Sequence, residues 1–575
     1  MSQNKSTRFT PLWMALCVVL GILLGTFYAN HFSGNRLNII NSSGNKLNNL
    51  LHIVNDQYVD TVNVNDLVEK AMPQILSELD PHSVYIAAKD VQIANDDLKG
   101  SFSGVGIEFT IRKDTIRVQN VIGNGPAERA GLIAGDKIVE VDDQPFVGKE
   151  VTTEEAMHRL KGPKDTKVKL GIIRYGEKKI RHITVTRGEI PTKSVTASYM
   201  IDNHTGYIKI KNFGENTYPE LLIALAKLSQ DGFRELIIDL RSNTGGYLAS
   251  AVQIANEFLP KGKLIVYTEG RKSPRQEYRS DGRGSYQQIP LVVLIDEGSA
   301  SASEILAGAI QDNDRGTIIG RRSFGKGLVQ QPIEFSDHSL IRLTIARYYT
   351  PSGRCIQKPY TSGSDKTYEE DLLTRYQHGE FFNQDSIKHT GPEYHTGNGR
   401  IVYGGGGITP DIFVPEDTLG MTSYYKEASM TGQILQFAFN YTDENRSKLK
   451  EFKDAWEMEK YLKRQNSVEK FVSWADKNGL KRRNLMIKKS YKLLERYVNS
   501  RIIYNMLSEE AWTQYLNQDD PAIMEALRLF RNGKAFPTVS EDGAEKKAQK
   551  VARLDDAKAF DFRGTHMKAT LTAYV

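Results

Sequence analysis

Two short stretches of the sequence combine residue types that could carry out acyl-transfer chemistry. The first, residues 297–308, is a run of small residues around Ser301 that follows an apolar segment. A hydroxyl at the start of a helix lies where backbone N–H groups stabilise developing negative charge, so Ser301 is a candidate nucleophile. The alternative is a plain helix cap, the more frequent role of serine at such a position. Glu304 is interpreted as a capping residue of the same helix.

The second stretch supplies a candidate base. Lys326 lies between Gly325 and Gly327 in an otherwise apolar connection. Burial there would lower the pKa of the amine, because it disfavours the ammonium form, and a neutral lysine can accept a hydroxyl proton. Together the stretches predict a Ser/Lys hydrolase, in which Lys326 takes the proton of Ser301 and returns it to the leaving amine.

A pair of glycines provides a candidate site for stabilising an oxyanion. Gly245 and Gly246 follow a predicted buried strand with the sequence ELIIDL. Without side chains they could present an unobstructed backbone N–H to the oxygen that becomes negative during attack. The polar residues before them, Asp239, Arg241 and Asn243, are interpreted as structural residues that pair around this turn.

The surrounding segments alternate between strands and helices, as in an α/β fold. Such elements are predicted, in chain order, at residues 206–211, 218–230, 235–240, 247–258, 291–295, 303–311 and 317–319. Residues 339–349 alternate like an antiparallel strand. The polar residues 269–288 are expected to form a loop or flap, and residues 361–398 to be irregular.

Residues 104–190 contain short β-rich runs separated by glycine, proline and charge, which predicts a small β-domain. Within it, residues 125–136 carry the pattern Pro-Ala-x-x-Ala-Gly-Leu-x-x-Gly-Asp and resemble PDZ domains. The loop where such domains bind a terminal carboxylate corresponds to Gly104, Val105, Gly106 and Ile107. Successive N–H groups in such a loop form an anion-binding nest, and the next strand can pair with a peptide. We expect this domain to bind protein C-termini, the alternative being a simple hairpin turn.

The N-terminus predicts export. Residues 11–29 contain no charged residue and, at about 1.5 Å per residue, could cross roughly 28 Å of hydrocarbon as a helix. Lys5 and Arg8 precede them. By the positive-inside rule, the segment is a single-pass inner-membrane anchor, with the catalytic body on the periplasmic side, or a cleaved signal that releases the protein to the periplasm.

Five consecutive regions are therefore predicted. They are a membrane segment at 1–33, a helical N-terminal region at 34–100, a PDZ domain at 101–190, a protease core at 191–415 and a charged helical extension at 416–575. Within the second region, residues 34–55 are expected to be a polar tether and residues 67–79 a helix. The fold class is multidomain α/β.

Several motifs in one order resemble the carboxyl-terminal processing, or tail-specific, serine protease family over about residues 65–415. Besides the PDZ pattern and the turn at Ser301, they are Leu79-Asp80-Pro81-His82-Ser83-x-Tyr85, Asp239-Leu240-Arg241-Ser242-Asn243-Thr244-Gly245-Gly246, Ser323-Phe324-Gly325-Lys326-Gly327, Tyr349-Thr350-Pro351-Ser352-Gly353-Arg354 and Gly406-Gly407-Ile408-Thr409-Pro410-Asp411. The resemblance implies a crotonase-like α/β protease core. It also implies that Ser301 is the nucleophile, Lys326 the general base and Gln330 the residue that orients the lysine. The N–H groups of Gly245 and Ala302 correspond to the oxyanion hole, with Gly246 as the alternative to Gly245.

Composition and spacing argue against other classes of protein. The net charge of +6 among 575 residues is ordinary and predicts no nucleic-acid partner, and two cysteines exclude a disulfide scaffold. Gly320 to Lys326 resembles a P-loop, but Gly327 stands where a magnesium-binding serine or threonine is required. His82 and His158 are interpreted as turn or surface residues, and no metal or cofactor is expected.

The combined expectation is an exported serine endopeptidase that cleaves proteins near their C-termini. Its partners would be substrates with accessible C-termini and the membrane, and a homo-oligomer is left open. The competing hypothesis is a non-catalytic PDZ-based scaffold that binds peptides without cleaving them.

Overall fold

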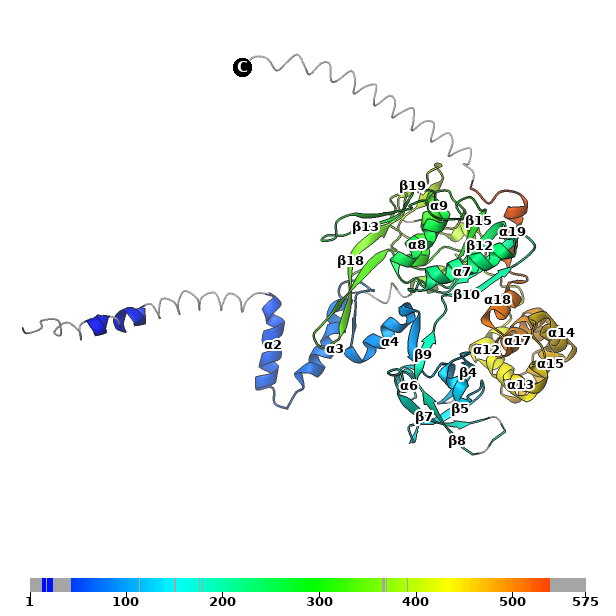
Figure 1. Cartoon of the computed structure of the whole chain (residues 1–575), viewed down its shortest axis with the longest axis horizontal. Helices are drawn as coiled ribbons and strands as arrows, with labels where there is room; N and C mark the ends of the chain where they lie inside the picture. The colour runs from blue at the N-terminus through cyan, green and yellow to red at the C-terminus, as the bar shows by residue number, and fades with distance from the viewer. Residues whose placement is uncertain are drawn as a thin grey trace, which may run out of the picture. The chain divides into compact units, whose positions relative to one another are not determined.

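The computed structural model describes residues 13–16, 18–23, 43–112, 114–148, 151–174, 176–177, 179–363, 368, 370–389 and 391–537 (Figure 1). It divides into two compact units, Met1–Leu79 and Asp80–Val575. Residues 11, 12, 17 and 24–29 of the predicted membrane segment lie outside the described residues. Within the described ranges, no helix is both long and apolar enough to span a bilayer.

The N-terminal unit contains the helices α2 (Ser43–Gln57) and α3 (Val64–Ser77). α3 confirms the helix predicted over residues 67–79 and begins earlier, because the side chain of Asn63 caps its first turn. The polar tether predicted for residues 34–55 is wrong where α2 lies, since leucines recur there at helical spacing among the asparagines.

The core of the second unit is a six-stranded sheet. Its strands lie in the order β10 (Val195–Met200), β11 (Thr205–Ile210), β12 (Glu235–Asp239), β15 (Leu291–Ile295), β16 (Thr317–Gly320) and β21 (Ile412–Phe413). β10 is antiparallel to β11, and the other neighbours are parallel. One face shares a hydrophobic core with the helices α7 (Thr217–Gln230), α8 (Leu248–Phe258) and α9 (Ala302–Asp312), as Figure 1 shows. The predicted α/β alternation is confirmed.

A second, five-stranded sheet carries the segment after Lys326. It consists of β1 (Val84–Ile86), β18 (Leu340–Tyr349), β13 (Leu264–Glu269), β14 (Gln276–Arg279) and β17 (Leu328–Glu334). β18 confirms the predicted strand at residues 339–349. Residues 269–288 are not only a loop, because β14 lies among them and pairs antiparallel with β13.

Residues 361–398 are more regular than predicted. They contain the helix α11 (Asp371–Gln377), a 3-10 helix η2 (Gln384–Ser386) and the strand β19 (Glu393–His395), which pairs with β20 (Ile401–Tyr403). A buried ion pair explains the order of α11, because the guanidinium of Arg375 lies 2.8 Å from the carboxylate of Glu380.

Residues 101–190 form a β-domain, as predicted. Its sheet has the strand order β3 (Ile107–Arg112), β4 (Thr115–Val121), β5 (Lys137–Val141), β7 (Lys167–Ile173) and β8 (Arg181–Thr186), with β6 (Gln144–Pro145) paired to β5. The helices α5 (Pro126–Ala130) and α6 (Thr153–Leu160) share its core. The paired strands β2 (Ser101–Gly104) and β9 (Gly188–Pro191) bracket the domain, and helix α4 (Ala88–Lys99) precedes it.

The C-terminal region is helical, as predicted. Its helices are α12 (Ser423–Met430), α13 (Gln433–Leu449), α14 (Ala455–Arg464), α15 (Ser467–Lys477), α16 (Asn484–Lys489), α17 (Tyr491–Met506), α18 (Glu509–Asn517) and α19 (Pro521–Arg531). Helices α12 to α18 share one hydrophobic core. α19 packs instead on the six-stranded sheet, on the face opposite α7, α8 and α9, together with Tyr207, Ile237 and Val292. This helix therefore packs with the six-stranded sheet rather than in a separate extension.

Candidate active site

Ser301 lies on a sharp turn between β15 and α9. Its backbone has φ 56° and ψ −115°, a conformation that costs a residue with a side chain on the order of 1–3 kcal/mol. Neighbouring contacts hold the turn in place: the Ala300 N–H and the Ser303 hydroxyl both donate to the carbonyl of Asn243, at 2.9 and 2.8 Å. A strained strand-to-helix turn of this kind exposes the side chain of a nucleophile.

The turn opens into a cavity of about 560 Å³. Ser301 and Gln330 both line it, and so do Gly246, Leu248, Ile305, Leu328 and Tyr348. A mixed lining of aliphatic side chains and a few polar groups is typical of a site that binds an organic ligand. The structure therefore brings the predicted nucleophile, one predicted oxyanion glycine and the predicted orienting residue to one cavity.

Glu304 forms hydrogen bonds both to the turn at Ser301 and to the loop that contains Lys326. Its carboxylate accepts hydrogen bonds from the backbone N–H groups of Ser301 (2.8 Å), Gly325 (2.7 Å) and Lys326 (2.9 Å). The hydroxyl of Ser323 donates to the same carboxylate at 2.5 Å. Burial raises the pKa of Glu304 to about 7, although these four donors act in the opposite direction. The predicted capping role is confirmed by the bond from Ser301, and the other three donors were not foreseen.

Tyr348 joins the same two residues from the second sheet. Its buried hydroxyl lies within hydrogen-bonding distance of two backbone carbonyls, those of Ser301 (3.0 Å) and Lys326. Two side chains, Glu304 and Tyr348, thus contact the backbones of both proposed reactive residues. Their relative position is consequently fixed by the folded core.

The amine of Lys326 is largely shielded from solvent. Burial lowers its pKa from the ordinary lysine value, and the positive charge of Arg342 lowers it further, whereas the charges of Glu304 and Asp80 raise it. Within the described chain, no hydrogen bond joins this amine to the hydroxyl of Ser301. The residue is followed by strand β17 and not by a helix, unlike the lysine of a P-loop.

A hydrogen-bonded chain that was not predicted runs from Gln330 to Asp80. The Gln330 Nε2 donates to the Thr344 hydroxyl (3.3 Å), which donates to the Asp80 carboxylate (3.0 Å). Ser83 also donates to Asp80 at 2.6 Å. His82, expected to be a turn residue, has its pKa lowered to about 4 by burial and by the charge of Lys326. The only sequence signal for this network was the motif around Asp80, to which no role was given.

The two candidate oxyanion glycines differ in their hydrogen bonding. The N–H of Gly245 donates to the side-chain oxygen of Asn243 at 2.9 Å and is therefore engaged. Among the described residues, no group accepts a hydrogen bond from the N–H of Gly246 or of Ala302. A Cβ atom on Gly245 would lie 2.6 Å from the Cβ of Ser301, and one on Gly246 would lie 2.2 Å from the carbonyl oxygen of Phe213. Only glycine fits at either position.

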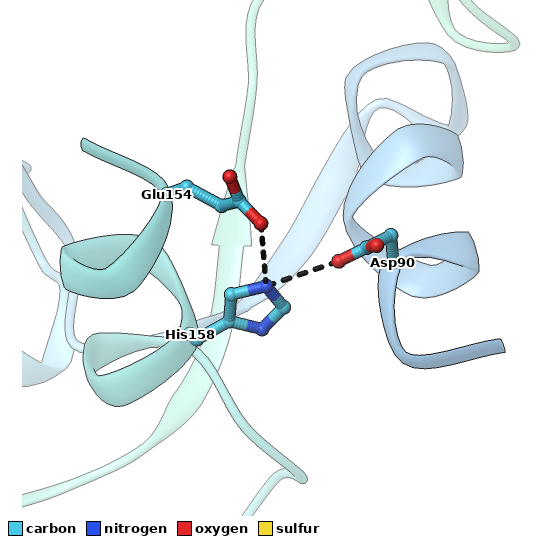
Figure 2. Close-up of side chains that lie close together, drawn as sticks. All are labelled: Asp90, Glu154 and His158. Atoms are coloured by element: carbon cyan, nitrogen blue, oxygen red, sulfur yellow. Dashed lines mark ion pairs between the residues drawn. The ribbon is translucent and has the colours of Figure 1, made fainter. Parts of the chain in front are cut away.

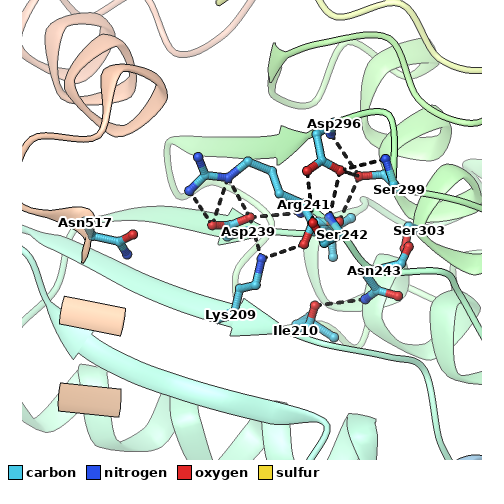
Figure 3. A network of polar contacts seen from close by, with 12 residues as sticks. Lys209, Ile210, Asp239, Arg241, Ser242, Asn243, Asp296, Ser299, Ser303 and Asn517 are labelled. Atoms are coloured by element: carbon cyan, nitrogen blue, oxygen red, sulfur yellow. Dashed lines mark hydrogen bonds and ion pairs between the residues drawn. The ribbon is translucent and has the colours of Figure 1, made fainter. Parts of the chain in front are cut away.

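The polar residues before these glycines are structural, as predicted (Figure 3). Asp239 is buried and forms ion pairs with Arg241 (2.7 Å) and Lys209 (3.0 Å). Burial alone would raise the pKa of Asp239, but the charges of these two partners hold it well below its ordinary value. Directly after strand β15, the carboxylate of Asp296 accepts a hydrogen bond from the Ser242 N–H (2.7 Å). This network fixes the strand ends next to the candidate oxyanion glycines.

The predicted carboxylate-binding loop joins β2 to β3 and is buried. Val105 and Gly106 accept hydrogen bonds through their carbonyl groups, from the N–H of Ala127 (2.8 Å) and of Ile122 (3.1 Å). Gly106 has φ 82°, a conformation that favours glycine. β3, which begins at Ile107, is the edge strand of its sheet and can therefore accept an additional strand.

One cluster in the described residues has the composition of a metal site (Figure 2). The Nε2 atom of His158 lies 3.0 Å from a carboxylate oxygen of Asp90 and 3.9 Å from one of Glu154. These are three ligand atoms of types that Zn²⁺ accepts. The side chain of Glu154 is 68% exposed, and the same geometry is that of an ion pair between α6 and α4. His158 is therefore a paired residue rather than an isolated surface histidine.

Three regions of the chain match known protein families. Residues 204–369 match peptidase family S41, and residues 103–185 match the PDZ domain. Residues 424–508 match a family of unknown function (DUF8443).

Individual relatives agree with these matches. The chain is 40% identical over 310 residues to a carboxy-terminal-processing protease of Bartonella bacilliformis, an alignment that covers 53% of this chain and 70% of that protein. It is 32% identical over 393 residues to a probable CtpA-like serine protease of Staphylococcus epidermidis, covering 64% and 79% respectively. Among solved structures, the photosystem II D1 C-terminal processing protease is 26% identical with a TM-score of 0.34, covering 64% of this chain and 92% of that one.

Proposed function

Because this chain belongs to the carboxy-terminal-processing serine proteases of peptidase family S41 and contains a PDZ domain, we propose that it is an endopeptidase that uses Ser301 and Lys326 to cleave proteins near their C-termini. The observation that best supports this proposal is that one side chain binds the backbones of both residues. Glu304 binds the backbone N–H groups of both, next to a cavity that Ser301 lines. Chemistry between them requires only that the lysine side chain reach the serine hydroxyl.

In the proposed reaction, the neutral amine of Lys326 removes the proton of Ser301 as its oxygen attacks the scissile carbonyl. The N–H groups of Gly246 and Ala302 stabilise the oxyanion, and the lysine then protonates the leaving amine. Water, activated by the same amine, hydrolyses the resulting ester. Gln330 orients the lysine through its side-chain oxygen, since its Nε2 is already bound to Thr344.

The PDZ domain is proposed to select the substrate. The terminal carboxylate would bind at the loop that contains Gly106, and the preceding residues would pair with the open edge of β3. We also propose that residues 11–29 anchor the protein in the inner membrane, with the catalytic body on the periplasmic side. The arrangement would limit its substrates to exported proteins.

The test compares wild type with Ser301→Ala on two versions of one unstructured peptide, which end in a free carboxylate or in an amide. The proposal expects wild type to cleave the free-carboxylate peptide faster, and Ser301→Ala to bind it without cleaving it. A wild type that binds but never cleaves would favour the non-catalytic scaffold. Cleavage by Ser301→Ala would exclude Ser301 as nucleophile.

A further inference from the structure

A second cavity, of about 340 Å³, lies between the PDZ sheet and the C-terminal helices. Arg117 on β4 and Lys137 on β5 line it from one side, and Gln433, Gln436, Asn440 and Trp474 line it from the other. Among the described residues, no carboxylate and no aliphatic side chain belongs to the lining. The volume is at the lower end of the range of about 300–1,000 Å³ that small-molecule sites occupy.

The two cations of this cavity repel each other. Arg117 and Lys137 are direct partners in the register of β4 and β5, and like charges in such a pair destabilise a sheet. Neither forms an ion pair with a carboxylate of the described chain. Asp443 is close enough for its charge to act on Arg117, but its carboxylate is bound by Arg446 at 2.7 Å. The cavity therefore has positive charge without a matching anion.

Two residues of the lining each carry a buried polar atom that has no hydrogen-bond partner within the described residues. One is a donor, the Nη1 of Arg117, and the other an acceptor, the Oε1 of Gln433. Leaving such a group unsatisfied costs about 1–3 kcal/mol, and more for a charged group. Burial also lowers the pKa of Arg117, although the charge of Asp443 acts in the opposite direction. A ligand that complements this lining carries an anionic group for the two cations and hydroxyl or amide groups for the amide side chains.

We propose that this cavity binds an acidic carbohydrate, a sugar that carries a carboxylate. The carboxylate lies between Arg117 and Lys137, a hydroxyl donates to Gln433, and the sugar ring packs against Trp474. Amide side chains such as Gln436 and Asn440 pair with the remaining hydroxyl groups. A peptide added as a strand does not fit, because β4 is already paired on both sides, to β3 and to β5. The ligand would link the PDZ domain to the C-terminal helices.

Isothermal titration calorimetry of the full chain with D-glucuronate, D-glucose and acetate tests the proposal. Glucuronate is expected to bind saturably, at least about tenfold more tightly than glucose or acetate, because only it supplies both the carboxylate and the hydroxyl groups. Arg117→Gln and Lys137→Gln should each weaken glucuronate binding by about tenfold or more. Arg181→Gln is the matched control, since Arg181 is a cation of the same domain that pairs with Glu177 and lies outside the cavity.

The proposal is overturned by no saturable binding of glucuronate, by equal binding of glucose, or by unchanged affinity in both cavity variants. Equal binding of acetate would reduce the site to one for simple anions and would also overturn it. Lys137 is exposed, so Lys137→Gln keeps the test valid if Arg117→Gln does not fold. The measurement is independent of peptide cleavage, so its result does not depend on the proposed protease activity.

Discussion

The protonation state of a single amine controls the proposed reaction. Burial, followed by the charge of Arg342, lowers the pKa of Lys326, so more of the amine is neutral near neutral pH than in a solvated lysine. The rate should therefore fall as the pH drops through this lowered pKa, and level off above it. Lys326→Ala should reduce kcat by at least about 100-fold while the fold is retained. Initial rates measured across pH, with the exposed Lys263→Ala as control, test both expectations.

The hydroxyl of Thr344 determines which end of the Gln330 amide faces the lysine. Asp80 can only accept, so Thr344 donates to it and must accept from the Nε2 of Gln330, which leaves the Oε1 for the lysine. Thr344→Val should lower kcat about tenfold or more and shift the pH profile of the rate, because Gln330 loses its anchor. Thr344→Ser should restore both. A valine variant with the wild-type kcat and pH profile would show that the chain has no positioning role.

At the scale of elements, Glu304 connects the start of α9 to the loop before β17. Three backbone N–H groups and the Ser323 hydroxyl converge on its two oxygens, so an amide cannot replace the carboxylate without placing its NH₂ group against a donor. Glu304→Gln should lower the free energy of unfolding by about 2 kcal/mol or more and abolish activity. Chemical denaturation measures the loss, and the exposed Glu334→Gln should show none.

The ionisation of Glu304 also makes stability depend on pH. Burial raises its pKa from 4.5 to about 7, so between these values the folded protein binds more protons than the unfolded chain. The stability that this group contributes is fully present below pH 4.5 and is lost as the pH rises through about 7. Wild type should therefore lose unfolding free energy over this range relative to Glu304→Gln, which cannot titrate there. A constant difference between the two proteins would contradict the raised pKa.

These elements also explain what the sequence could and could not predict. Ser301 and Lys326 could be proposed as a reactive pair because a small-residue turn and a lysine between glycines are local patterns. The contact of Thr344 with Asp80 joins residues 264 positions apart and depends on the pairing of β18 with β1, which no local pattern specifies. Likewise, the choice between Gly245 and Gly246 depended on which N–H the side chain of Asn243 accepts. The hydrophobic periodicity of the sequence predicted the helices and strands. The hydrogen bonds between them could be found only from the three-dimensional structure.

For the whole molecule, helix α19 completes the protease core. It covers the sheet face that α7, α8 and α9 leave open, and its capping residue Asp520 pairs with Arg241 at 2.7 Å, next to the turn of the candidate oxyanion glycines. From the sequence, this helix was assigned to a separate extension because the region around it is rich in charged residues. Its apolar face packs on a sheet that is distant in the sequence, and no local pattern shows that contact. The stability of the catalytic sheet should therefore depend on residues far beyond the peptidase family match, which ends at residue 369.

A pair of adjacent residues on α19 tests this dependence. Ile523 is 1% exposed and packs against the sheet, whereas Met524 is 48% exposed. Ile523→Ala should lower the free energy of unfolding by about 2–5 kcal/mol, because it removes buried methyl groups and leaves a cavity, while Met524→Ala should change it little. Thermal unfolding of both variants, followed together with peptide cleavage, provides the measurement. If α19 were an independent extension, Ile523→Ala would leave the temperature at which cleavage is lost unchanged. If the unfolding temperature and the temperature at which cleavage is lost fall together, the helix and the active site unfold as one unit.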